Sequence, residues 1–219
     1  ISRGTLNLYR CTITGSNNAA AIIMASGTTL NMYDGANVLG NSVRDDSAVL
    51  VRGEFNMYGG LIAGNYANSA NSYGGGVRVG GSTTAATFHM YDGTIQDNMA
   101  DNGGGVSVTG GSTFYMHGGT IENNATRGGG WQNYGGGVLV HNGTFNMYGG
   151  TITGNQTGTG NGGGLALRER TQSTANIYGG TISNNTSHGY GGGIYVSGNT
   201  LNIQPGNGKI NITGNKALD

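Results

Sequence analysis

The chain has 219 residues, of which 47 are glycine, one is proline and 9% are charged. This composition excludes collagen, because the glycines do not recur at every third position, and it departs from that of an ordinary globular domain. Ten basic residues balance ten acidic ones, so we expect no nucleic-acid partner.

The same composition limits metal and membrane chemistry. The single cysteine, Cys11, cannot form an internal disulfide bond, and no group of Cys and His residues has the spacing of metal ligands. We therefore expect no metal site and no cofactor. The chain has no apolar run long enough to span a bilayer, so we expect no direct membrane insertion, and we expect any export signal or anchor to lie outside this segment.

A repeat runs through the whole chain. The segment Phe55 to Gly60 returns almost unchanged as Phe145 to Gly150. Weaker copies place the residue equivalent to Asn56 at intervals of 24 to 33 positions, at Asn7, Asn31, Asn56, His89, Tyr115, Asn146, Asn176 and Asn202. We interpret the eight copies as about eight coils of a single domain, residues 1–219, and expect it to be a segment of a longer repeat array.

Three short extended pieces follow one another in each coil. The first is a glycine triplet with an alternating aliphatic segment, such as Gly105 to Val108. The second is the Phe-Asn-Met-Tyr piece, and the third reads Thr-Ile-x-x-Asn, as in Thr120 to Asn124. The alternation within each piece is typical of strands with one buried face.

Each kind of strand returns only after a full coil, so it must pair with its own copy rather than in a hairpin. The sequence thus predicts an all-β fold, a right-handed parallel β-helix (solenoid) of about eight coils with three short parallel sheets. The handedness rests on the predominance of right-handed crossovers. The columns expected inside are Val77, Val106, Val138, Leu165 and Ile194; Phe55, Phe88, Phe114 and Phe145; Met32, Met57, Met90, Met116 and Met147; and Ile62, Ile95, Ile121, Ile152, Ile182 and Ile212.

An asparagine closes the third piece of most coils. We expect a structural ladder, in which each side-chain amide bonds the next, at Asn41, Asn65, Asn98, Asn124, Asn155, Asn185 and Asn215. The pairing of Gly-Gly-Gly-aliphatic with Ile-x-x-Asn resembles the repeats of polymorphic outer membrane proteins and related β-helical adhesins, which carry Gly-Gly-Ala-aliphatic and Phe-x-x-Asn. This resemblance implies surface display and adhesion.

An outward stripe of tyrosine and asparagine accompanies the second piece. Tyrosine offers a flat apolar face with a polar tip, so the stripe is a candidate for binding sugar rings. The alternative is that stacked aromatic side chains only stabilise the sheet. The candidate residues are Tyr9, Tyr33, Tyr58, Tyr91, Tyr148, Tyr178, Asn56 and Asn146.

No catalytic residues are expected. Parallel β-helices include pectate lyase-like enzymes, which need clustered carboxylates. Here only Asp97 and Glu122 stand in adjacent coils, and Asp45-Asp46 lies several coils away. Outward threonines such as Thr151 and Thr153 resemble the face of ice-binding solenoids, but Ala63, Gln96 and Glu122 interrupt that array.

We therefore expect a non-catalytic structural or adhesive module, namely a stalk, shaft or filament subunit that is secreted or held at the cell surface. The alternatives are a polysaccharide-binding or polysaccharide-degrading protein and, less favoured, an ice-binding solenoid. The expected partners are a host or surface glycan or protein, or further copies of the chain stacked end to end through uncapped coils.

Overall fold

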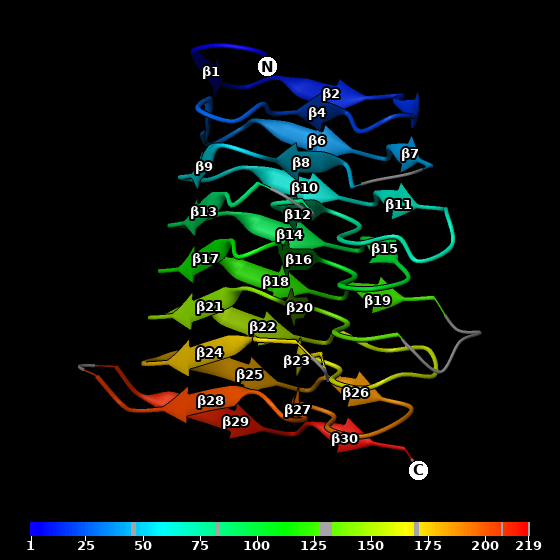
Figure 1. The fold of residues 1–219 in the computed structure, drawn as a ribbon, viewed down its shortest axis with the longest axis vertical. Helices are drawn as coiled ribbons and strands as arrows, with labels where there is room; N and C mark the ends of the chain where they lie inside the picture. The colour runs from blue at the N-terminus through cyan, green and yellow to red at the C-terminus, as the bar shows by residue number, and fades with distance from the viewer. Residues whose placement is uncertain (45–46, 82–83, 128–132, 169–170, 207, 219) are drawn as a thin grey trace.

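The computed structural model describes residues 1–44, 47–81, 84–127, 133–168, 171–206 and 208–218. All its regular elements are short parallel strands, which stack in columns along one long axis from the N-terminal to the C-terminal end (Figure 1). The predicted parallel β-solenoid is confirmed. Among the described residues no helix is present that could cross a membrane.

Sheet A contains the second piece of every coil. Its eight strands pair in register, so that Phe55, Phe88 and Phe114 are direct neighbours. Its strands are β1 (Thr5–Leu8), β5 (Thr29–Met32), β9 (Glu54–Met57), β13 (Thr87–Met90), β17 (Thr113–Met116), β21 (Thr144–Met147), β24 (Thr174–Ile177) and β28 (Thr200–Ile203).

Sheet B contains the third piece and also has eight strands. Ile62, Ile95 and Ile121 stand in one row across its parallel strands. Its strands are β2 (Thr12–Thr14), β6 (Asn37–Leu39), β10 (Leu61–Ala63), β14 (Thr94–Gln96), β18 (Thr120–Glu122), β22 (Thr151–Thr153), β25 (Gly180–Ser183) and β29 (Ile210–Thr213).

Sheet D contains the first piece, the aliphatic segment after each glycine triplet. Val77, Val106 and Val138 are direct neighbours in it. Its seven strands are β4 (Ile22–Ile23), β8 (Val49–Val51), β12 (Val77–Val79), β16 (Val106–Thr109), β20 (Val138–His141), β23 (Leu165–Leu167) and β27 (Ile194–Val196).

The expectation of three sheets is wrong, because a fourth, sheet C, follows the ladder asparagine. Its strands have only two residues each, and the first residue differs in every one, so they leave no alternation to detect. They are β3 (Asn17–Asn18), β7 (Ser42–Val43), β11 (Tyr66–Ala67), β15 (Met99–Ala100), β19 (Ala125–Thr126), and the separate pair β26 (Thr186–Ser187) and β30 (Lys216–Ala217).

The number of turns also differs from the expected eight coils. The chain passes seven times around the solenoid, with only isolated bridges at Gln156 on the side of sheet C in the sixth pass, and then forms β28, β29 and β30, so the described fold has about seven turns. The difference arises because the eight copies of the second piece are separated by only seven full turns of the chain.

The interior is filled by the predicted columns. The four Phe side chains and the five Met side chains are fully buried, as are Val77, Val106, Val138 and Leu165. Ile212 is an exception, with 41% of its surface exposed, because β29 is the last strand of sheet B and no further coil covers it. Ile194, in the last strand of sheet D, is likewise only partly buried.

The glycine triplets have a steric basis. Gly103, the first glycine of its triplet, has a φ of +64°, a backbone conformation that residues other than glycine rarely adopt. At Gly105, the third glycine, a Cβ would lie 2.8 Å from the carbonyl oxygen of Gly137 and 3.0 Å from Cγ of the ladder residue Asn124. The contact with the ladder explains why glycine stands where the resembling repeats carry alanine.

Candidate functional site

The asparagine ladder occupies the edge between sheets B and C. Six of its members are no more than 1% exposed, and Asn215, in the last coil, is partly exposed. In the central coil, Nδ2 of Asn124 donates to the backbone oxygen of Ile95 at 2.9 Å and to Oδ1 of Asn155 at 3.0 Å. Its Oδ1 accepts from the backbone nitrogen and from Nδ2 of Asn98, both at 3.0 Å.

This pattern repeats from coil to coil, for example where Asn98 and Asn155 each donate to the ladder residue of the next coil and to a backbone oxygen of sheet B. The amide oxygen uses both lone pairs and the amide nitrogen uses both hydrogens. A buried side chain with every polar group satisfied has nothing left for a ligand, so the ladder holds the coils together.

The tyrosines form one continuous stack along the outer side of sheet A, into which His117 inserts between Tyr91 and Tyr148. Centroids of neighbouring rings lie 4.5 to 5.3 Å apart, and their planes are inclined by 4° to 17°. Tyr9, Tyr58, Tyr91 and Tyr148 are between 41% and 60% exposed. The stack is therefore an accessible aromatic surface seven rings long.

The asparagines beside this stack are less accessible. Asn56 and Asn146 lie on the outer face of sheet A but are only 6% and 7% exposed. Nδ2 of Asn56 donates to Oδ1 of Asn31 at 3.2 Å, and Nδ2 of Asn176 donates to Oδ1 of Asn146 at 2.8 Å. These amides bond one another and contribute little to an outer binding surface.

Two coils replace the outer asparagine by aromatic residues. The rings of His89 and Tyr115 are stacked at 4.7 Å, and Nδ1 of His89 lies 3.4 Å from Nε2 of His117. Partial burial lowers the pKa of both histidines, and for His89 the nearby His117 lowers the pKa further. At neutral pH the rings of His89 and Tyr115 thus form an uncharged extension of the tyrosine stack.

The candidate carboxylates Asp97 and Glu122 lie at sheet B, in adjacent coils. The backbone nitrogen of Asp97 donates to the backbone oxygen of Glu122, so these residues are neighbours, and Oδ2 of Asp97 accepts from Gln96. Asp101 instead forms an ion pair with Arg127 at 2.6 Å. The candidate Asp45-Asp46 lies outside the described residues.

Two further expectations concern sheet B and metals. The outer face of sheet B places Ala63, Gln96 and Glu122 next to one another, so the row of threonines is interrupted. Within the part of the chain that the structure describes, no three His, Cys, Asp or Glu residues are grouped so as to hold a metal ion.

A polar cluster on the outer face of sheet D was missed by sequence reasoning. Arg168 is half-buried, and its Nη1 donates to the hydroxyl of Tyr73 at 2.6 Å. The Tyr73 ring stacks on His141 at 5.6 Å, and Cζ of Arg78 lies 5.3 Å from the Tyr73 centroid. The cluster joins residues up to 95 positions apart, so no local sequence motif predicts it.

Comparison with protein-family models, with curated proteins and with solved structures finds no match to this chain. The architecture and the geometry of its surfaces therefore carry the functional argument.

Proposed function

We propose that the chain is a non-catalytic structural and adhesive module of a secreted or cell-surface protein, in which the solenoid serves as a rigid shaft that carries recognition surfaces. The supporting observation is the continuity of its inner columns. The Phe column and the asparagine ladder pass from coil to coil without a break between Phe55 and Phe145 and between Asn41 and Asn215.

This continuity favours a mechanical role. Because each coil contacts mainly its neighbours, a solenoid resists bending only as well as its least bonded interface. Here every interface along the ladder carries the same amide bonds. The resemblance of the Gly-Gly-Gly-aliphatic and Ile-x-x-Asn motifs to the repeats of surface adhesins supports the extracellular assignment.

Labelling of intact cells of the source organism tests the proposal. Antibodies raised against the purified chain should stain intact cells or detect the protein in the medium, and external protease should remove the cell-bound signal. Staining that appears only after permeabilisation would contradict the proposed location.

A second candidate is a polysaccharide-binding surface on the tyrosine stack. The specific observation in its favour is the run of seven stacked rings, four of them tyrosines more than 40% exposed. Binding of neutral glycans by the wild-type chain, lost in the double variant Tyr58→Ala/Tyr91→Ala, would support it. A glycan array without neutral hits would count against it. Cleavage of a bound glycan that Asp97→Asn or Glu122→Gln abolishes would favour an enzyme instead.

A further inference from the structure

The cluster on the outer face of sheet D draws its side chains from several coils. Arg78 stands on β12, Thr109 on β16 and His141 on β20, while Arg168 directly follows β23. Tyr73 lies at the centre, between the guanidinium group of Arg78, the ring of His141 and the hydroxyl-bound Nη1 of Arg168. The cluster therefore lies across four consecutive coils, along the axis of the solenoid.

Tyr134 fixes one end of this cluster. Its ring is 3% exposed and packs with Leu139 and Ala166 on the outer face of sheet D. Cζ of Arg168 lies 5.6 Å from the centroid of this ring. The Arg168 side chain is thus held between two tyrosines, which limits the entropy that a ligand would have to remove on binding.

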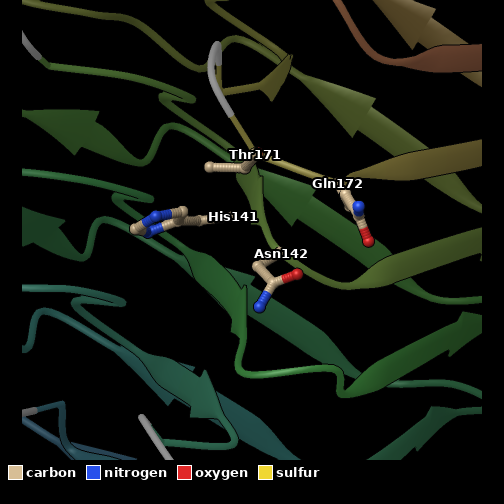
Figure 2. Close-up of a pocket in the computed structure, with 4 residues that line it drawn as sticks. All are labelled: His141, Asn142, Thr171 and Gln172. Atoms are coloured by element: carbon tan, nitrogen blue, oxygen red, sulfur yellow. The ribbon is translucent and has the colours of Figure 1, made fainter.

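Two open cavities adjoin the cluster. One of about 250 Å³ is lined by Tyr73, Arg78 and Thr109, and one of about 510 Å³ is lined by Thr171 and Gln172. His141 and Asn142 line both, so the cavities form one groove. Figure 2 shows the side chains of His141 and Thr171, which come from different coils, pointing in the same direction.

Arg78 is the charged side chain among the described residues that line the two cavities. Among the described residues that line the two cavities, none is acidic. Burial, together with the charges of Arg168 and Arg78, lowers the pKa of His141 to about 4. At neutral pH, His141 is therefore an uncharged hydrogen-bonding group in a positive field.

We propose that this groove binds an acidic polysaccharide, with a carboxylate or sulfate group of the polymer held by Arg78, which lines the groove, and by Arg168, which borders it through its bond to Tyr73. Guanidinium groups suit such anions because they donate in a planar fork. The exposed amide side chains of Asn142 and Gln172 supply bonds for sugar hydroxyls. An open groove that runs across coils fits a linear polymer better than a small molecule, which prefers enclosure. This inference rests on the proposed adhesive function and names its ligand class.

Binding to three polymers tests the inference: polygalacturonate as the carboxylate probe, heparin as the sulfate probe and dextran as the neutral control. The purified chain is titrated with each at pH 7 and low ionic strength. We expect binding to at least one acidic polymer, weakening as salt is added, and at least tenfold weaker binding to dextran. The preferred acidic polymer distinguishes the carboxylate from the sulfate source.

Matched variants locate the site. R78Q and R168Q should each weaken binding at least tenfold, whereas R44Q, which removes an exposed arginine beside sheet C, should change it less than twofold. Because R168Q also removes the bond to Tyr73, Q172A at the exposed rim provides a variant with little risk to folding, with an expected loss of about threefold.

Two results would overturn the inference: no binding to either acidic polymer, or equal losses in R44Q and R78Q, which would mean unspecific charge attraction. Its failure is separable from that of the proposed function. Surface labelling without polymer binding would refute the groove alone, and polymer binding by a protein found only inside cells would refute the location alone.

Discussion

The asparagine ladder and the tyrosine stack are both columns of one residue type that return once per coil, yet they differ in what they leave available. Inside, Asn124 satisfies every polar group of its amide at 0% exposure. Outside, Tyr58 stacks on Tyr33 and Tyr91 while 43% of its surface remains exposed. Repetition alone therefore does not distinguish a buried structural column from one that leaves accessible surface. The two kinds of column are distinguished by whether the side chains have all their polar groups and surface in contact with the protein.

The variant that we expect to lose the most stability is Phe114→Ala, in the buried Phe column. Phe114 is fully buried between Phe88 and Phe145, at centroid distances of 4.6 and 5.0 Å. We expect a loss of about 4 kcal/mol in the free energy of unfolding, because the removed ring leaves a cavity. Denaturant titration measures it, with Phe114→Leu expected to lose less than half as much. Equal losses for the two variants would mean that the column is not close-packed.

The second test compares the same residue type inside and outside. Asn124→Ala leaves the backbone N–H and the amide of Asn98 without their acceptor and the oxygen of Ile95 without its donor. We expect a loss of about 3 kcal/mol. The matched variant Asn176→Ala removes an outer amide that water can replace, and should cost less than about 1 kcal/mol. Similar values for the two would remove the distinction between the columns.

The third test measures how strongly the groove over sheet D excludes water from His141, as the interior excludes it from the buried columns. His141 binds protons less readily when folded, since its pKa falls from 6.5 to about 4. Between these values the unfolded chain holds more protons, so stability should decline as the pH falls from about 6.5 to about 4. After allowance for solvent screening of this partly exposed group, the decline attributable to His141 is about 1 to 2 kcal/mol.

Thermal and denaturant unfolding across this pH range, compared with His141→Gln, isolates the contribution of His141. His89 and His117 also have lowered pKa values, so both proteins retain some slope and only the difference counts. No difference between wild type and His141→Gln would show that the groove is as well hydrated as the outer stack.

The smallest expected effect belongs to the outer stack. Tyr58→Ala removes an exposed ring with two stacking neighbours, and we expect a loss of about 1 kcal/mol. Tyr58→Phe keeps the ring and should leave the unfolding midpoint nearly unchanged. A loss as large as that of Phe114→Ala would place the outer column among the structural ones.

Much of this fold was predictable because its strands repeat in kind. Phe-Asn-Met-Tyr, Thr-Ile-x-x-Asn and the glycine triplets each predicted a sheet that is present, and their alternation predicted which side chains are buried. Sheet C was not predictable in this way. Strands as short as Tyr66–Ala67 and Met99–Ala100 have no period to read, and they share only a small alanine, so the sequence gives too little pattern to align them.

The groove escaped sequence reasoning for a different physical reason. Tyr73 and Arg168 come from loops that differ between coils, and the interaction between them depends on how far each loop folds back over sheet D. The handedness of the winding likewise has no signal in any single residue type, and it remains a prediction from the general preference for right-handed crossovers.

The break in the outer asparagine column at His89 and Tyr115 has a consequence for folding. In the four coils that carry Phe the inner columns are nearly the same, so a strand there that paired one coil out of place would still bury Phe on Phe and bond Asn to Asn. Such an error costs little at the core. Residues that differ from coil to coil, such as the His89–Tyr115 stack and the Arg127–Asp101 pair, are satisfied only in the correct order. These irregular positions therefore favour the pairing of the correct neighbouring coils over the pairing of coils that are otherwise alike.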